Sequence, residues 1–241
     1  ERGDAGGSGV EGFRDGDRTT IALPKVQTQA MQQLQKMHKP IVFVCMSGSA
    51  VSYNWEAEHL SAVIQAWYGG QAAGTALTDI LFGRYNPSGR LPLTFYRSDA
   101  DLPPFEDYSM QGRTYRYFEG DVLYPFGYGL SYTTFKYRNL KVPSEAQTGD
   151  SLRVSVEVVN TGKMAGEEVV QLYLSHREMA EEAPLCALKK FMKIKLKPNE
   201  RRTVSFVLSP RELAFVDLAG EIRQDAGTLK VFVGGVCPSH P

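Results

Sequence analysis

The sequence predicts an α/β layered domain with a mainly parallel sheet, followed by an all-β sandwich. In the first half, short continuous apolar runs at 41–46 and 62–68 alternate with segments of helical periodicity. This is the pattern of parallel strands that are covered on both faces. In the second half, apolar and polar residues alternate along short segments separated by turns, as in a sandwich. We expect the boundary near residues 131–135, which gives domains 1–132 and 133–241.

The first helix is predicted to begin after Leu23-Pro24, because residues 1–23 are glycine-rich and charged, as in a loop. Apolar residues then recur on one helical face, and Lys36, His38 and Lys39 gather at its carboxyl end, where they suit the helix dipole. The members of the apolar face are Val26, Ala30, Met31, Leu34 and Met37.

Two buried parallel strands are predicted at residues 41–46 and 62–68. The first turns at Ser47-Gly48-Ser49, and the second ends at Gly69-Gly70 before a helix that begins at residue 71 and stops at Gly83. The glycine pair is either a tight connection or a place where a loop approaches a ligand. In parallel sheets ligands bind beyond the carboxyl ends of strands, so residues 46–49 and 68–70 should form the rim of a pocket.

Residues 97–128 carry many aromatic rings with little periodicity, which predicts a long structured loop packed against another surface. After Phe135 the pattern changes to about seven short strands. Leu152, Val154, Val156 and Val158 should face one side of the first long strand, with polar residues between them. Further strands are expected at 169–175, 190–196, 203–208 and 228–233.

Bulk composition excludes several classes of function. The chain has 27 basic and 27 acidic residues, so it lacks the charge of a nucleic-acid binder. No apolar run approaches the roughly 18 residues of a membrane-spanning helix. Three cysteines, Cys45, Cys186 and Cys237, lie far apart and are odd in number, so no disulfide framework is predicted, and Cys45 is expected in the core.

Two long motifs resemble glycoside hydrolase family 3. The first is Ala-Trp-Tyr-Gly-Gly-Gln-Ala-Ala-Gly-Thr-Ala-Leu-Thr-Asp-Ile-Leu-Phe-Gly-Arg-Tyr-Asn-Pro-Ser-Gly-Arg-Leu-Pro-Leu-Thr-Phe at 66–95, and the second is Tyr-Pro-Phe-Gly-Tyr-Gly-Leu-Ser-Tyr-Thr-Thr-Phe at 124–135. The resemblance covers essentially the whole chain. It implies that the sandwich is fibronectin type III-like and that the chain is a fragment of a longer enzyme.

The resemblance implies retaining hydrolysis of β-linked sugars from the non-reducing end, with two carboxyl groups roughly 5–5.5 Å apart. The family's nucleophile lies on an N-terminal (β/α)8 barrel, which this sequence lacks, so the isolated chain is expected to be inactive. The family's acid/base precedes a segment that here reads Gly-Phe-Arg-Asp-Gly-Asp-Arg-Thr at 12–19. Glu1 is therefore the candidate acid/base, unless the true donor precedes the chain, and Glu11 is too close to the segment to match.

The expected substrate is a β-linked oligosaccharide or an aryl or alkyl glycoside. β-Glucosidase activity is favoured over β-xylosidase activity on base rate alone. The contacts that decide which sugar is bound are expected to come mainly from the barrel. The family is expected in secreted or periplasmic locations, and a homodimer is left open. No cofactor is expected.

Aromatic rings suit sugar stacking, and Trp55, Tyr68 and Tyr108 are the candidate substrate-wall residues. Trp67 lies inside an apolar run and is expected in the core. Glu56 and His59 are close in sequence but have no further ligands nearby, so no metal site is predicted. Asp17-Arg18 is expected to tie down its loop rather than to react.

Two alternatives to the enzyme remain. One is a non-catalytic carbohydrate-binding or adhesion module built from the same two domains. The other treats residues 133–241 as a protein-interaction module, because the run from Lys189 to Lys197 is basic. Alternating lysines there are explained more simply as the solvated face of a strand, which guards against edge aggregation.

Overall fold

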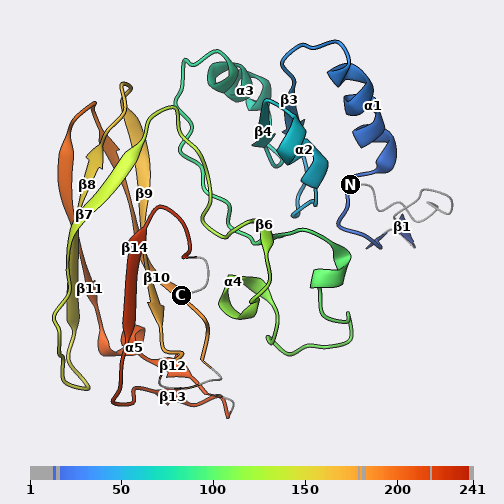
Figure 1. The fold of residues 1–241 in the computed structure, drawn as a ribbon. Coiled ribbons are helices and arrows are strands. Elements are labelled where there is room, and N and C mark those ends of the chain that lie inside the picture. The colour runs from blue at the N-terminus through green and yellow to red at the C-terminus, as the bar shows by residue number, and fades with distance from the viewer. Residues whose placement is uncertain (1–12, 15–16, 179, 181–182, 218, 239–241) are drawn as a thin grey trace. The chain divides into compact units, whose positions relative to one another are not determined.

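The computed structural model describes residues 13–14, 17–178, 180, 183–217 and 219–238. The chain divides into two compact units (Figure 1). The first contains residues 1–82, 94–108 and 120–124, and the second contains residues 83–93, 109–119 and 125–241. Each unit is described by itself below.

The first unit has short strands and helices. Its helices are α1 (Lys25–Gln35), α2 (Asn54–His59), α3 (Ala73–Leu81) and a 3-10 turn, η1 (Asp99–Asp101). Its strands are β1 (Phe13–Arg14), β2 (Asp17–Arg18), β3 (Val42–Cys45), β4 (Ala62–Gln65), β5 (Phe95–Tyr96) and β6 (Val122–Tyr124). The predicted helix after Pro24 is confirmed, with the proline at its N-cap. Gly83 follows α3 with a φ of 70°, a conformation that glycine adopts readily and that stops a helix.

The prediction of a mainly parallel sheet is not confirmed. Strands β3 and β4 pair in parallel, with Val42 opposite Ala62 and Cys45 opposite Gln65. The other strand pairs of the described residues are antiparallel, including β5 with β6. The reason is that the chain returns between β5 and β6 as a loop containing only the turn η1 and the short helix α4 (Thr114–Tyr117), so it forms a reversal rather than a crossover.

Aromatic side chains form the interior of the first unit. Tyr53 is almost fully buried, and its ring lies 5.8 Å from Phe43, 6.0 Å from Phe95 and 6.1 Å from Tyr124. Burial raises the pKa of the Tyr53 hydroxyl, so this group stays neutral. The prediction that aromatic residues of 97–128 pack on a surface therefore holds for Tyr124, whereas Phe105 and Tyr108 are exposed.

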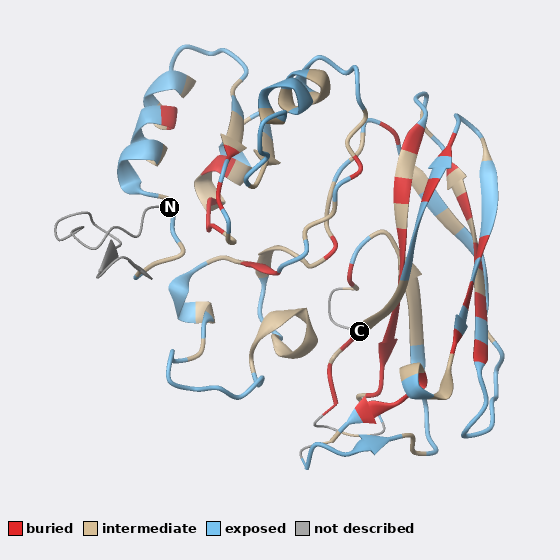
Figure 2. Cartoon of the chain, turned by 180° about the vertical axis from the view of Figure 1, so that it is seen from behind, coloured by how far each residue is buried: buried red, intermediate tan, exposed pale blue. Residues whose placement is uncertain are grey.

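The two strands of the parallel pair are less covered than predicted. Strand β4 is shorter than the predicted 62–68, and its residues are exposed or half-buried. Figure 2 shows little burial over α1 and α3, where Val26, Leu34 and Leu81 are exposed. In α1 only Met31 is buried. The expectation of strands covered on both faces is thus wrong for the described residues of this unit.

The second unit is built on two three-stranded antiparallel sheets (Figure 1). One sheet has the order β11-β8-β7 and the other β10-β9-β14. The bounds are β7 (Phe135–Lys141), β8 (Leu152–Asn160), β9 (Gly166–Ser175), β10 (Ala187–Leu196), β11 (Arg201–Leu208) and β14 (Lys230–Gly234). Helix α5 (Pro210–Leu213) and the hairpin of β12 (Phe215–Val216) and β13 (Ile222–Arg223) follow β11.

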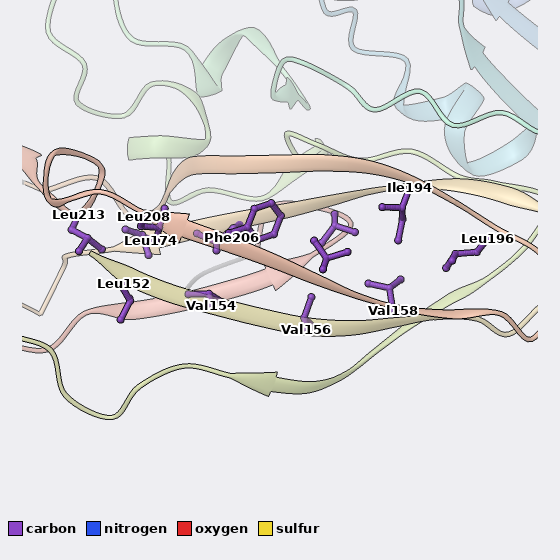
Figure 3. Close-up of a cluster of buried hydrophobic side chains, with 13 residues drawn as sticks. Leu152, Val154, Val156, Val158, Leu174, Ile194, Leu196, Phe206, Leu208 and Leu213 are labelled. Carbon is purple, nitrogen blue, oxygen red and sulfur yellow. The ribbon is translucent and has the colours of Figure 1, made fainter. Parts of the chain in front are cut away.

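The hydrophobic core of this unit joins both sheets. Val154, Val156 and Val158 of β8 are buried in alternation with more exposed residues, as predicted. They belong to one cluster with Leu172 and Leu174 of β9, and with residues of β10, β11 and α5 (Figure 3). Each sheet therefore covers the apolar face of the other.

Residues 125–129 pack closely in the second unit, where the motif contains two glycines. A Cβ on Gly127, whose φ is 80°, would lie 2.2 Å from Gln171 Oε1, and one on Gly129 would lie 2.2 Å from the carbonyl oxygen of Gly89. Glycine at these two positions thus permits the close packing. The predicted division into domains 1–132 and 133–241 stays a prediction.

Candidate functional site

The carboxyl ends of β3 and β4 lie at one edge of the parallel pair. Cys45 and Gln65 are opposite each other, and the backbone N–H of Ala66 donates to the Cys45 carbonyl oxygen at 2.8 Å. The loops that follow, residues 46–52 and 66–70, therefore leave the sheet from the same edge. We refer to these two loops as the rim.

Polar side chains connect the two rim loops at their bases. Ser47 is buried, and its hydroxyl accepts a hydrogen bond from Gln65 Nε2 at 3.2 Å while donating to the Ser49 carbonyl oxygen at 2.8 Å. Because Ser47 belongs to one loop and Gln65 to the end of β4, these bonds fix the relative position of the two strand ends.

The segment that precedes α1 lies along the rim. Arg18 donates from Nη1 to Ser49 Oγ at 2.8 Å and from Nε to the Thr20 carbonyl oxygen at 3.2 Å. The Ser52 backbone N–H donates to the Ile21 carbonyl oxygen at 2.7 Å, and Ala22 forms a parallel bridge with Ser52. Arg18 thus ties down its loop, as the sequence predicted, and does so at the end of β3. We call residues 18–22 the leading segment.

A second anchor of the leading segment is Asp99. Its Oδ2 accepts a hydrogen bond from Thr20 Oγ1 at 2.6 Å, and its Oδ1 accepts one from the Ile21 backbone N–H at 2.7 Å. Hydrogen bonds to an ionised carboxylate are stronger than neutral ones. Ser98 caps η1 in a capping box with Asp101, which positions Asp99 at the start of that turn.

Trp67 occupies an unusual backbone conformation in the second rim loop. Its φ is 55°, in the left-handed region that side chains with a Cβ rarely adopt. The residue is half-buried, and its ring contacts Phe95 edge-on at 6.3 Å between centroids. Strained backbone of this kind concentrates at functional sites. The expectation that Trp67 is a core residue is met only in part, since one part of it stays accessible at the rim.

The three predicted wall residues lie on different elements. Trp55 is half-buried in α2, where its ring stacks on His59 at 4.8 Å. Tyr68 is exposed in the rim, directly after Trp67. Tyr108 is exposed in the loop between η1 and α4. Of the three, only Tyr68 belongs to the rim, and the sugar-binding role of all three stays a prediction.

Glu1 and Glu11 lie outside the described residues. The structure does describe where the chain goes after them, because residues 18–22 are held at the rim. Residues 18–22 are thus fixed at the edge where ligands of parallel sheets bind.

Glu56 and His59 have separate partners. The Glu56 carboxylate is buried and accepts a hydrogen bond from Thr28 Oγ1, which joins α2 to α1. His59 Nδ1 lies 2.8 Å from the Trp55 carbonyl oxygen. No cluster of three or more His, Cys, Asp or Glu side chains that could hold a metal occurs among the described residues. Within that same part of the chain, no helix has the length and apolarity to cross a bilayer.

Sequence reasoning missed Gln65 and Asp99 as residues that shape the rim. Gln65 was hidden inside an apolar run, although a polar residue within a strand that is predicted to be buried is itself a signal for a site. Asp99 is separated from Thr20 by 79 positions, so no local pattern could have connected them. The glycine pair was identified, and Gly69 has a packing role, since a Cβ there would lie 2.7 Å from Ala73 Cβ at the start of α3.

A hollow in the second unit is less suited to binding a sugar than the rim is. It lies on β7, β8 and β11 and is lined by Asn139, Leu140, Lys141, Ser155, Glu157 and Thr203. None of these lining residues is aromatic, so the hollow lacks the rings that stack on pyranose faces.

Comparison with known proteins gives matches along nearly the whole chain. Residues 3–132 match the model of the glycosyl hydrolase family 3 C-terminal domain, and residues 168–236 match that of the fibronectin type III-like domain. The chain is 44% identical over 227 residues to a xylan 1,4-beta-xylosidase of Xylanibacter ruminicola, which covers 93% of this chain and 26% of the relative. It is 38% identical to a periplasmic beta-glucosidase of Salmonella typhimurium over 230 residues, 90% of this chain and 30% of the relative.

Solved structures show the same similarity. A β-glucosidase from Erythrobacter marinus superposes with a TM-score of 0.81 at 35% identity, covering 94% of this chain and 31% of that protein. A β-glucosidase from Listeria innocua, solved in complex with glucose, gives a TM-score of 0.81 at 31% identity over 93% of this chain. The chain therefore spans about a quarter to a third of the length of these relatives.

Proposed function

Because this chain belongs to glycosyl hydrolase family 3, we propose that it is the C-terminal portion of a retaining, exo-acting β-glycosidase. The substrate class is a terminal non-reducing β-linked sugar, in an oligosaccharide or an aryl or alkyl glycoside. Support comes from the matches to both domains and from relatives that are named β-xylosidases and β-glucosidases. The relatives are three to four times as long as the chain, which supports an upstream barrel that carries the nucleophile.

The observation that carries the site assignment is the anchoring of the leading segment at the rim. Three hydrogen bonds within one compact unit hold this segment. Arg18 donates to Ser49, the Ser52 backbone N–H donates to Ile21, and Thr20 donates to Asp99. A loop that ends there can deliver a carboxyl group to a substrate at the edge of the parallel pair. We assign the acid/base role to Glu1, which protonates the departing oxygen and later activates water. The nucleophile, on the barrel, attacks the anomeric carbon.

The rim provides groups of the kind that contact a sugar. Tyr68 is an exposed ring, and Trp67 is accessible beside it. Trp55 and Tyr108 are proposed to complete the wall. The preferred sugar is glucose, with xylose as the alternative that the name of the Xylanibacter relative favours. The Salmonella relative is named periplasmic, which supports a periplasmic or secreted location.

The first experiment measures release of p-nitrophenol from the β-glucoside and the β-xyloside. The 241-residue chain alone should give no turnover, because covalent catalysis needs the absent nucleophile. The polypeptide extended upstream through the barrel should hydrolyse one of the two substrates, and the ratio of kcat/KM values assigns the sugar. Turnover by the isolated chain would overturn the proposal that it holds only half of the catalytic pair.

The second experiment tests Glu1 in the extended protein. Glu1→Gln should reduce kcat strongly for an alkyl glycoside, whose leaving oxygen needs a proton, by roughly the 10²–10⁴-fold typical of general acid catalysis. An aryl glycoside with an acidic phenol should be affected less in its first step, because that phenolate leaves without protonation. Glu11→Gln is the matched control and should leave both substrates unaffected. Equal behaviour of the two variants would remove Glu1 from the mechanism.

A further inference from the structure

Two of the three cysteines, far apart in the sequence, meet in the second unit. The Sγ atoms of Cys186 and Cys237 are 3.0 Å apart, although 51 positions separate the residues. Cys186 directly precedes β10, and Cys237 follows β14 by three residues. Strands β10 and β14 lie on opposite sides of β9, so the chain after β14 must come back across β9 to bring Cys237 to this position.

The two sulfur atoms lie in an apolar cluster. Both side chains are buried, with 1% of Cys186 and 5% of Cys237 exposed. Tyr173 of β9 belongs to the same cluster, and Tyr115, Phe126, Leu188 and Phe232 pack against it. The neighbouring backbone is fixed as well, since the Cys237 N–H donates to the Phe126 carbonyl oxygen at 3.1 Å and the Phe126 ring stacks on Tyr115 at 4.2 Å.

We propose that Cys186 and Cys237 form a structural disulfide in this protein. The sulfur atoms are only about 1 Å farther apart than the bonded distance of about 2.05 Å, so a small side-chain adjustment would join them. The two thiols lose two protons and two electrons as the S–S bond forms. A disulfide oxidant, either a small-molecule disulfide or a disulfide oxidoreductase, accepts them and is reduced to two thiols.

Other uses of a thiol pair fit this cluster less well. A metal centre needs further ligands, and none of the described groups provides three metal-binding side chains together. A reactive thiol would be accessible and would have a lowered pKa. Here the contact with Cys186 and burial raise the pKa of the Cys237 thiol, so its thiolate is scarce in the folded protein. The bond should therefore form as the chain folds, before the cluster closes around it.

The proposed bond would fasten residues 235–238 to the sandwich. Residues 235–238 follow β14 and form no helix or strand. The Gln171 Nε2 to Gly235 carbonyl bond of 2.7 Å and the Cys237 to Phe126 bond are two of their contacts. A covalent tie across about 50 positions removes many conformations from the unfolded chain, which stabilises the folded one.

The test refolds the 241-residue chain from urea with mixed oxidised and reduced glutathione, followed by alkylation and tryptic mass mapping without reduction. The expected result is one species in which peptide 178–189 is linked to peptide 231–241, with a mass two hydrogens below their sum. Cys45 is the internal control and should be alkylated, because its sulfur contacts Ser47 rather than another cysteine. Quantitative alkylation or glutathionylation of Cys186 and Cys237 would overturn the proposal.

Thermal unfolding gives an independent measurement. The oxidised chain should melt about 5–10 °C above the reduced chain, as expected for a tie of this loop length. The double variant Cys186→Ala with Cys237→Ala should show no such difference, whereas Cys45→Ala should retain it. Equal melting temperatures of oxidised and reduced wild-type chain would also contradict a structural role for the bond.

Discussion

Strand β8 of the sandwich and strand β3 of the first unit are both rich in valine, but they have different surroundings. In β8, Val154, Val156 and Val158 are almost fully buried against the facing sheet. In β3, Val42 is 43% exposed and only Cys45 is buried. A sandwich sheet needs cover on one face, and its partner sheet provides it. A parallel pair needs cover on both faces, and the described residues provide only part of it.

The difference shows that the two regions obtain stability in different ways. The sandwich has a closed core and a nearly buried ion pair, in which Arg90 Nη2 lies 2.6 Å from Glu168 Oε2. The first unit is held by an aromatic cluster and by hydrogen bonds at the rim, with apolar side chains of α1 and α3 left exposed. The predictions below test this contrast in order of decreasing effect.

The largest difference between the two regions is expected when one partner of an ion pair is replaced and the free energy of unfolding is measured. Arg90 and Glu168 have side chains 10% and 4% exposed, and Tyr137 also donates to Glu168 at 2.6 Å. Arg90→Met leaves a buried carboxylate without its counter-charge and should lower the free energy of unfolding by about 3–5 kcal/mol. Arg97→Met, which breaks the exposed pair with Asp121, should cost roughly 0–1 kcal/mol. Urea unfolding measures both losses. Similar losses for the two variants would contradict the proposed difference between the two regions.

Replacing a leucine by alanine in each region should show the same contrast, because the loss of unfolding free energy depends on how closely the leucine is packed. Leu174 is fully buried in β9, and Leu174→Ala should cost about 2–5 kcal/mol because it leaves a cavity. Leu81 in α3 is 46% exposed, and Leu81→Ala should cost well under half as much. A large loss for Leu81→Ala in the isolated chain would mean that α3 is covered in solution.

The leading segment should detach more readily from the rim when its carboxylate anchor is removed. Asp99→Ala deletes the bonds from Thr20 and Ile21 and should weaken the attachment of the leading segment by about 1 kcal/mol. Tryptic cleavage after Arg18 should then become about fivefold faster. Glu58→Ala, at an exposed position of α2, is the control and should not change the cleavage rate.

Acid should weaken the sandwich slightly through Glu212. Hydrogen bonds from Lys190 and from the Ser209 backbone N–H lower the pKa of this carboxyl to about 2. The stabilisation is therefore present above the ordinary carboxyl pKa near 4.5 and is lost as the pH falls toward 2. Because solvent screens this partly exposed group, the loss should be only about 0.5–1 kcal/mol.

The control for this effect is Glu145→Gln, at an exposed position in the loop after β7. Urea unfolding at pH 5.5 and pH 3 should show that Glu212→Gln reduces the difference between the two conditions, whereas Glu145→Gln does not. An unchanged difference in Glu212→Gln would show that other carboxyl groups cause the acid sensitivity.

The sequence predicted the sandwich better than the first unit because alternation is a local signal. The period of two along Leu152 to Val158 identifies the buried face without knowledge of the partner sheet. The apolar run at 62–68 also indicated a strand, and β4 is present and parallel to β3. A run without alternation does not reveal where the strand ends, so Trp67 was included although it lies beyond β4 with a left-handed backbone.

The sequence by itself indicated the family, through the resemblance of two long motifs that the family model confirms, and the alternating core, which depends on a pattern within a few residues. Only the tertiary structure decided which distant side chains meet: Asp99 with Thr20, Arg90 with Glu168, and Cys186 with Cys237. Such contacts depend on chain reversals that bring residues dozens of positions apart into one neighbourhood, and no local periodicity records the path between them.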